Sequence, residues 1–274
     1  MTDKSSVRRL DRGDGNHVAF AARRGTGPTV VFLGGFRSDM TGTKALALDE
    51  WARRRGRGFL RFDYLGHGQS SGRFEEGTIG RWLDDSLAAI DRLTRGKLVL
   101  VGSSMGGWLA LLAARARADR LAGLVLIAPA PDFTRELLLK DLTPAQRARL
   151  KRVGRLEVPS QYSPEPSVFT WRLVEEGRRH LLLDKPLRLD CPVRLLHGQK
   201  DPDVPWEYSI RIARHLQSPD LVTTLVKDGD HRLSTPADIA RLISAVEEVS
   251  ASRPRSRPAP RGRSGSAKPR PARA

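Results

Sequence analysis

A serine lies between two glycines in the pentapeptide Gly102-Ser103-Ser104-Met105-Gly106, with an apolar run before it and a helical pattern after it. A serine on such a tight strand-to-helix turn has a strained backbone, and glycines two residues to either side relieve the crowding. The N-terminus of the following helix offers free amides to a developing oxyanion. The pattern predicts Ser104 as a nucleophile, with a plain glycine-rich turn as the alternative.

A serine hydroxyl needs a base to take its proton, and a carboxylate must orient that base. On a strand–serine–helix scaffold, the expected chain order is serine, then acid, then histidine. His231 is the candidate base, because it lies in the polar loop KDGDHRLS between the last strand and the last helix. Asp201 is the candidate acid, just after a strand in HGQKDPDVP, with Asp203 as its rival. A solvated loop histidine and a turn aspartate are the alternatives.

The other histidines after Ser104 fit the role of base less well. His197 ends a strand and His215 lies inside an amphipathic helix, so both are interpreted as structural, and His180 lies in an inserted segment. Before the serine, His67 in a Gly-His-Gly turn is interpreted as loop packing.

An oxyanion hole needs two backbone amides. Met105, directly after the serine, supplies the first. The strand before Gly34 runs into Gly35 and Phe36, so we expect a bend at Gly35 that aims the Phe36 amide at the serine and borders the substrate. A plain turn is the alternative.

These residues need a scaffold, and the chain alternates short apolar runs with longer helical patterns. Because strand, helix and strand follow one another, the sequence predicts an α/β fold with a mostly parallel, doubly wound sheet. We expect strands at 17–22, 29–33, 58–63, 97–102, 121–128, 192–198 and 221–226, and helices at 45–56, 81–95, 105–117, 206–217 and 235–249.

The alternation breaks at about 130–190, a proline-containing stretch too long for an ordinary loop, which predicts an inserted cap. Trp171 is predicted to contact substrate from the cap, together with Phe169 and 181–183, although cap packing explains these residues equally well. Trp108 and Cys191 are interpreted as packing residues. The domain is expected over 17–250, after an N-terminal extension at 1–16.

Composition limits the class of protein. The 274 residues are 39% hydrophobic and carry a net charge of +17, with eight of the basic residues in 251–274. That tail is predicted to be disordered; it could contact nucleic acid by charge alone, but an idle, solvated tail is favoured.

One cysteine excludes an intrachain disulfide. No apolar stretch is long enough to span a membrane and no targeting peptide is visible, so we expect a cytoplasmic protein.

The motifs together resemble the α/β-hydrolase superfamily, and more narrowly its abhydrolase-domain-ten type of acyl-protein thioesterase. The shared stretches run from about 17 to 249 and include GTKALALDE (42–50), RFDYLGHGQSSG (61–72), VGSSMGGWL (101–109), PSQYS (159–163), CPVRLLHGQKDPDVPW (191–206) and DHR (230–232). The resemblance implies Ser104, Asp201 and His231 as nucleophile, acid and base. It also implies hydrolysis of S-palmitoyl groups and acyl glucuronides. The basic tail has no counterpart in the family pattern.

The sequence thus predicts a serine hydrolase that cleaves acyl thioesters or carboxylic esters of a protein or small-molecule carrier, without metal or organic cofactor. A carboxylesterase or acyl-glucuronide hydrolase of small molecules is the first alternative. A non-catalytic ligand-binding protein on the same fold is the second.

Overall fold

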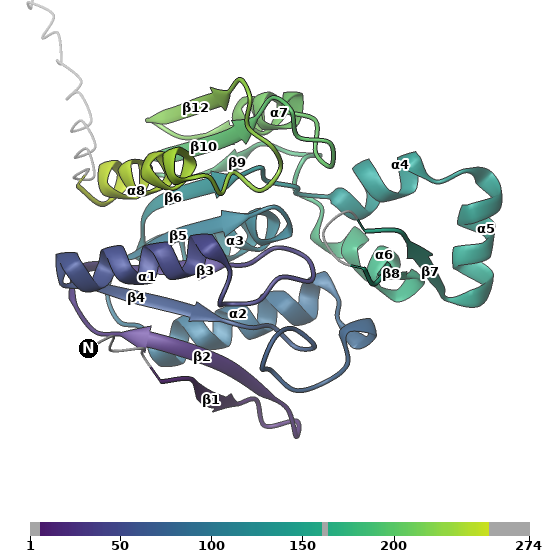
Figure 1. Ribbon diagram of the computed structural model, residues 1–274, viewed down its shortest axis with the longest axis horizontal. Helices are drawn as coiled ribbons and strands as arrows, with labels where there is room; N and C mark the ends of the chain where they lie inside the picture. Colours follow the sequence, from purple (N-terminus) through teal and green to yellow (C-terminus); the bar gives the residue numbers. More distant parts are fainter. Residues whose placement is uncertain (1–5, 161–163, 252–274) are drawn as a thin grey trace, which may run out of the picture.

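The computed structural model describes residues 6–160 and 164–251, built on one eight-stranded sheet in the order β1-β2-β4-β3-β5-β6-β10-β12 (Figure 1). The two edge pairings β1–β2 and β2–β4 are antiparallel and the others are parallel. The strands are β1 (Arg8–Asp11), β2 (His17–Arg23), β3 (Thr26–Leu33), β4 (Arg57–Phe62), β5 (Leu98–Ser103), β6 (Leu121–Ile127), β10 (Val193–Gly198) and β12 (Leu221–Val226). The predicted α/β class and mostly parallel sheet are confirmed.

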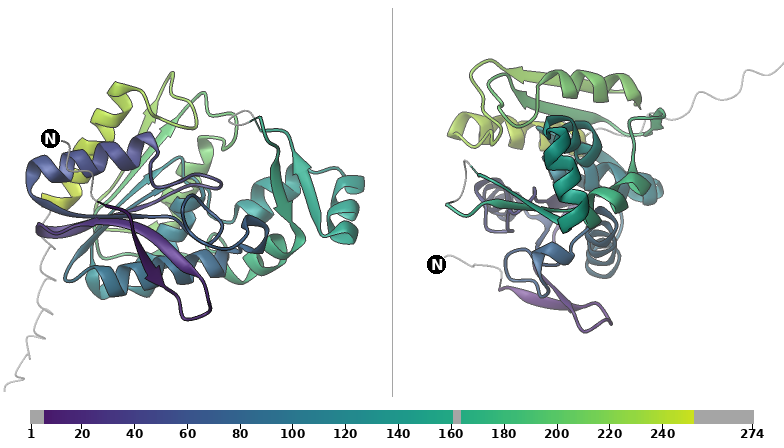
Figure 2. Two further views of the ribbon diagram at one scale, coloured as in Figure 1. Left: turned by 60° about the horizontal axis from the view of Figure 1, so that its bottom comes forward. Right: turned by 90° about the vertical axis from the view of Figure 1, so that its right-hand side faces the viewer.

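Helices cover both faces of the sheet (Figure 2). One face carries α1 (Thr43–Arg55) and α8 (Pro236–Ala251); the other carries α2 (Ile79–Leu93), α3 (Met105–Ala116) and α7 (Glu207–His215). Successive residues of a strand point to opposite faces. In β5, Leu98 and Leu100 accordingly join the core under α2 and α3, whereas Val99 and Val101 join the core under α1 and α8. The short helices η1 (Phe74–Glu76) and η2 (Ala118–Arg120) lie in connections.

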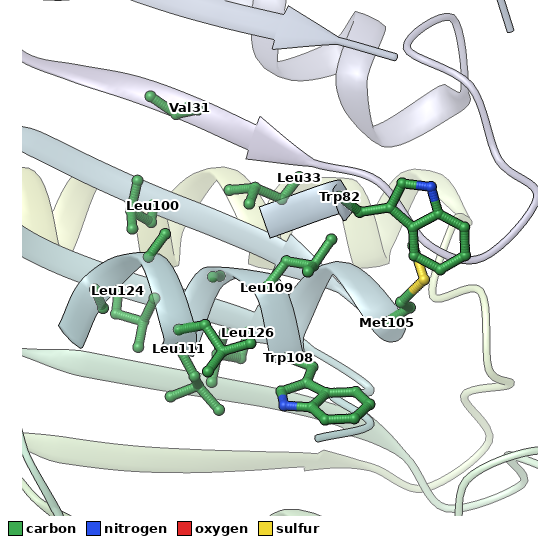
Figure 3. Packing of buried hydrophobic residues seen from close by; sticks show 14 of the residues in the cluster. Val31, Leu33, Trp82, Leu100, Met105, Trp108, Leu109, Leu111, Leu124 and Leu126 are labelled. Carbon is green, nitrogen blue, oxygen red and sulfur yellow. The ribbon is translucent and has the colours of Figure 1, made fainter. Parts of the chain in front are cut away.

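Helix α3 lies deepest in the molecule, with Trp108, Leu109 and Leu111 packed near Leu100 and other strand residues (Figure 3). A helix that is apolar all round belongs in a core. The two glycines in its first turn each cost about 1 kcal/mol of helix propensity. Burial of a large apolar side chain contributes about 1.5–3 kcal/mol. Packing therefore fixes the start of α3, directly after Ser104.

The chain between β6 and β10 forms a cap beyond the carboxyl ends of the parallel strands (Figure 1). Its helix α5 begins at a capping box of Thr143 and Gln146 and ends at Gly154 in the left-handed conformation. The cap contains η3 (Thr134–Leu138, a π-helix), α4 (Leu139–Asp141), α5 (Pro144–Val153), the antiparallel strands β7 (Arg155–Val158) and β8 (Ser167–Thr170), α6 (Trp171–Gly177) and η4 (Arg178–His180). A short pair, β9 (Leu187–Arg188) with β11 (Leu216–Gln217), follows it.

Two expectations at the chain ends need comment. Residues 1–16 were expected to be an extension, yet β1 within them pairs with β2 as the edge of the sheet. Its alternating polar sequence RRLD buries Leu10 alone, as suits an edge strand, and a single buried residue gave too weak a pattern to recognise. The tail was predicted to be disordered over 251–274; Ala251 is the last residue of α8, and 252–274, with the predicted nucleic-acid contact, lie outside the described residues. In the described part of the chain, no helix has the length and apolar character to cross a membrane.

Candidate active site

Ser104 stands at the turn between β5 and α3 with φ 55° and ψ −120°. A Cβ at Gly102 would lie 2.3 Å from the Gly106 carbonyl oxygen, and a Cβ at Gly106 would lie 2.1 Å from the Leu33 carbonyl oxygen. Only glycine fits at either position, which confirms the expected reason for the two glycines. The Ser104 amide donates to the Ile127 carbonyl at 2.9 Å and ties the strained turn to β6.

The structure brings His231 to Ser104, from a loop 127 residues further along the chain. His231 Nε2 lies 3.1 Å from Ser104 Oγ, and Nδ1 lies 2.7 Å from Asp201 Oδ2. Lys44, which sequence reasoning missed, anchors this loop: its Nζ donates to the Arg232 carbonyl at 2.5 Å and to Ser234 Oγ at 3.2 Å. Burial lowers the pKa of Lys44 to about 8. No sequence signal marks Lys44, because only the fold brings α1 beside this loop.

The side chain of Asp201 is fully buried and accepts hydrogen bonds at both carboxylate oxygens. Oδ1 accepts the amides of Asp203 at 2.8 Å and Val204 at 2.9 Å, while Oδ2 faces His231 and also His197 Nε2 at 3.1 Å. Burial raises the pKa of the Asp201 carboxyl, but the bonds from His197 and His231 outweigh it and hold the pKa well below its usual range. The rival Asp203 meets this network through its backbone amide, and the contact of His231 Nδ1 is to Asp201.

The loop after β3 lies directly against the serine. A Cβ at Gly35 would lie 3.4 Å from the Ser103 carbonyl oxygen and 3.5 Å from Ser104 Cβ. A tight turn follows, in which the amide and hydroxyl of Ser38 donate to the Gly35 carbonyl at 3.2 and 2.8 Å. Met105 is the first residue of α3, where an amide has no acceptor within the helix. The Met105 amide and the backbone at Gly35 thus lie next to Ser104, while the part of the Phe36 amide in an oxyanion hole stays a prediction.

Two buried side chains, His67 and Asp63, accept hydrogen bonds from backbone amides of the loop after β3. Arg37 has φ 57°, and its amide donates to His67 Nε2 at 3.3 Å. His67 Nδ1 faces the Leu65 carbonyl at 3.1 Å and therefore carries the proton, which leaves Nε2 as the acceptor. Burial lowers the pKa of His67 to about 4. At the far end of the loop the Met40 amide donates to Asp63 Oδ1 at 2.6 Å, and burial raises the pKa of Asp63 to about 6.

Aromatic rings join the same loop to the cap. Phe36 stacks on Phe169 of β8, with centroids 4.9 Å apart and planes within 6°, and meets Phe74 and Phe133 edge to face. The guanidinium of Arg37 donates to the Pro166 carbonyl at 3.1 Å. The cap therefore contacts the loop beside the serine through Phe169, whose contact with substrate stays a prediction.

Other predicted residues lie elsewhere. Trp171 packs in the small core of the cap, with Lys151 and Arg178 over its ring at 6.0 and 5.6 Å. These contacts agree with the alternative of cap packing, and none joins Trp171 to Ser104. Trp108 packs beneath the cap, where its Nε1 donates to the His180 carbonyl at 3.0 Å. Cys191 is buried, which raises the pKa of its thiol to about 12.

One group of acidic and histidine side chains could in principle hold a cation. The ligand atoms of Asp201, Asp203 and His231 lie within 4.8 Å of one another, alone in this respect among residues 6–160 and 164–251. Both oxygens of Asp201 and both ring nitrogens of His231 already have hydrogen-bond partners. Hydrogen bonding thus accounts for the arrangement.

Comparison with known proteins follows this geometry. Residues 30–242 match the model of the alpha/beta hydrolase family. The human palmitoyl-protein thioesterase ABHD10, mitochondrial, is 39% identical over 248 residues, which are 90% of this chain and 80% of that protein. The cattle protein of the same name is 38% identical over 247 residues, with the same shares covered.

Two solved structures agree closely with this chain. A putative hydrolase from Agrobacterium vitis S4 is 45% identical with a TM-score of 0.84, covering 89% of this chain and 98% of that chain. Mouse alpha/beta hydrolase domain-containing protein 10 is 37% identical with a TM-score of 0.83 over the same shares.

The expectation of a cytoplasmic protein is contradicted by these relatives, because the human and cattle enzymes are mitochondrial by name. The absence of a visible targeting peptide was the basis of that expectation, and it is a weak one. The narrower resemblance drawn from the motifs is confirmed. On its match over most of its length and on these relatives, the chain belongs to the alpha/beta hydrolase family, in the group that contains the ABHD10 proteins.

Proposed function

We propose that this protein hydrolyses acyl thioesters, S-palmitoyl groups among them, through an acyl-enzyme formed on Ser104. The observation that carries the proposal is the continuous hydrogen-bonded path from Ser104 Oγ through His231 to Asp201, at 3.1 and 2.7 Å. A serine, a histidine and a carboxylate in this arrangement form an activated nucleophile. The name of the human and cattle relatives, palmitoyl-protein thioesterase, supports the thioester as the bond attacked.

In acylation, Ser104 Oγ attacks the carbonyl carbon of the thioester while its proton passes to His231 Nε2. Asp201 holds the imidazole with Nδ1 protonated and stabilises the imidazolium that forms. The amides of Met105 and Phe36 donate to the oxyanion of the tetrahedral intermediate. The carbon–sulfur bond then breaks, and the imidazolium returns its proton to the departing thiolate.

In deacylation, water takes the place of the serine. His231 Nε2 removes a proton from water as its oxygen attacks the acyl carbon, and the same two amides receive the second oxyanion. The bond to Ser104 Oγ breaks, the proton returns to that oxygen, and the carboxylic acid leaves. Acylation uses only side chains and amides of this chain, and deacylation uses the same groups and one water molecule.

A fluorophosphonate probe and two matched substrate series test the proposal. We expect the probe to label wild type and Ser103→Ala but not Ser104→Ala. Ser103 is a matched control, because it is the neighbouring serine, at the end of β5. S-acyl and O-acyl substrates of equal chain length then compare the bonds, and long S-acyl chains should be favoured.

Other outcomes would point to the alternatives. Faster turnover of O-acyl than of S-acyl substrates would favour a carboxylesterase or acyl-glucuronide hydrolase. A folded wild type that is neither labelled nor active would contradict the proposed catalysis and favour a ligand-binding protein.

A further inference from the structure

His197 lies behind the proposed acid and is completely buried. It is the penultimate residue of β10, four residues before Asp201, and its ring has polar neighbours at both nitrogens. Nε2 lies 3.1 Å from Asp201 Oδ2 and 3.0 Å from the Val204 carbonyl oxygen, while Nδ1 lies 2.7 Å from Ser209 Oγ of α7. A histidine that only filled space would not need three polar contacts in an apolar core.

The neighbours of His197 determine where its proton lies. The ionised carboxylate of Asp201 and the carbonyl of Val204 can only accept hydrogen bonds, so Nε2 must carry the proton and donate to both. In the neutral ring Nδ1 is then an acceptor, and the hydroxyl of Ser209 donates to it. Every polar atom of this buried group is thereby satisfied, as is usual in protein interiors.

Two histidines consequently donate to the same oxygen of one carboxylate. His231 Nδ1 reaches Asp201 Oδ2 from the side of Ser104, and His197 Nε2 reaches it from the interior. A hydrogen bond to a charged acceptor stabilises the charge and lowers the basicity of that acceptor. The shared oxygen is therefore a weaker partner for His231 than an unshared one would be.

We propose that His197, held by Ser209, is a positioning residue that fixes the Asp201 carboxylate and withholds part of its negative charge from His231. This inference rests on the proposed function, because it concerns the base of that reaction. His197 does not touch the substrate in this assignment. It acts through Asp201, and the effect is greatest on the protonation of His231.

Loss of the His197 donor should shift the pH dependence of kcat/KM in one direction. The Asp201 charge would act fully on His231, so the imidazolium would be more stable and the acidic limb of the kcat/KM profile would move to higher pH. The other ionisable groups near His231 are Asp203 across the site, Asp230 next to it in the chain, and the two cations Arg232 and Lys44 of the loop and α1. None of them is altered by a change at His197.

Two substitutions separate the hydrogen bond from the shape of the side chain. His197→Leu removes the donor, and we expect the acidic limb to rise by about half a pH unit or more and kcat/KM at pH 7 to fall about 10-fold. His197→Gln keeps an N–H donor on a side chain of similar reach and should restore most of both. His215→Leu, a histidine of α7 whose Nδ1 meets the Arg211 carbonyl, is the matched control and should leave the profile unchanged.

Two further measurements keep the test valid if His197→Leu does not fold. Ser209→Ala removes the donor to Nδ1 without touching Asp201, and should move the acidic limb in the same direction by a smaller amount. Nitrogen NMR of the imidazole rings should show His197 protonated at Nε2 in wild type.

The outcomes that overturn this inference differ from those that overturn the proposed function. An acidic limb that stays in place in both His197→Leu and Ser209→Ala, or a His197 ring protonated at Nδ1, would refute the role of His197 while the enzyme remains active. Wild type without activity, or Ser104→Ala with full activity, would instead refute the proposed function.

Discussion

The two sides of Ser104 are built in different ways. On the acid–base side, side chains meet side chains: Asp201 receives His231 and His197, which are themselves held by Ser104 and Ser209. On the other side lie the amides proposed to bind the oxyanion, and we call it the oxyanion side; there, buried side chains hold the backbone of the loop after β3 instead.

On the oxyanion side, buried side chains make hydrogen bonds to backbone groups of the loop after β3. His67 accepts the Arg37 amide, Asp63 accepts the Met40 amide, and Arg61 donates to the Met40 carbonyl at 3.0 Å. Each side contains one buried histidine, and the two histidines make hydrogen bonds of opposite direction. The contrast thus holds for the two histidines: His197 donates to the Asp201 carboxylate, whereas His67 accepts from the Arg37 amide.

The largest effect is expected from breaking the acid–base side. Asp201→Asn should lower kcat/KM about 10³- to 10⁴-fold, because an amide favours the wrong tautomer of His231 and cannot stabilise the imidazolium. Asp203→Asn is the matched control, two residues along the same loop, and should change kcat/KM little. Steady-state kinetics on one S-acyl substrate measure both. Equal losses in the two variants would contradict the choice of Asp201.

Breaking the oxyanion side should cost less, since the amides remain and only their placement changes. His67→Phe keeps an aromatic ring at this position but removes the nitrogen that accepts the Arg37 amide. We expect kcat to fall about 10- to 100-fold. His67→Gln offers a carbonyl oxygen to the same amide and should recover part of the loss. The acidic limb should not move in either variant, in contrast to His197→Leu. A moved limb would erase the distinction between the two sides.

The two buried ionisable groups of the oxyanion side, His67 and Asp63, should make the free energy of unfolding depend on pH in opposite ways. His67 has a pKa of about 4 in the fold against an ordinary value of 6.5, so between these values the unfolded chain binds the proton and stability is lost as pH falls. From pH 7 to pH 5 this amounts to about 2 kcal/mol. Asp63, with a pKa raised to about 6, acts oppositely: the fold holds its proton, and stability is lost as pH rises through about 4 to 6.

Urea unfolding at pH 7 and pH 5 measures these contributions. His67→Phe should lose less stability than wild type on going to pH 5, and Asp63→Asn should lose more. The same pH dependence in wild type and both variants would show that neither group is buried as described.

The smallest effect is expected where the cap meets the oxyanion side. Phe169→Ala removes the ring stacked on Phe36, and an aromatic pair contributes about 0.5–1.5 kcal/mol beyond burial. We expect kcat/KM for long-chain thioesters to fall about 5-fold. Trp171→Ala is the comparison within the cap, because its contacts stay inside the cap core, and it should reduce stability more than chain-length preference. A larger loss of kcat/KM in Trp171→Ala than in Phe169→Ala would support the predicted contact of Trp171 with substrate.

Much of the fold could be predicted from the sequence. Apolar runs of β5 and β6 are buried on both faces, and a continuous apolar run is the signal of a central parallel strand. β1 and the strand pair β7–β8 were missed, because half-exposed strands of four residues carry too short a pattern. Asp132 was missed as well: at φ 60° and fully buried, its carboxylate accepts the amides of Leu182 and Leu183 and joins the start of the cap to its end.

The sequence by itself determined the residues whose side chains define a local motif. Gly102, Ser104 and Gly106 are recognisable because steric crowding at one turn restricts the residue types within five positions. Asp201 and His231 are recognisable because they follow strands in the required order. These constraints are local, so a single chain displays them.

The tertiary structure alone decided what lies behind those residues. His197, His67 and Lys44 act on atoms that the sequence separates by up to 190 positions, and several of those atoms are backbone amides or carbonyls common to all residue types. A backbone group leaves no mark in the sequence, and a buried histidine has the same letter whether it donates or accepts. Only the packing of β10, α1 and the loop after β4 around Ser104 assigns those roles.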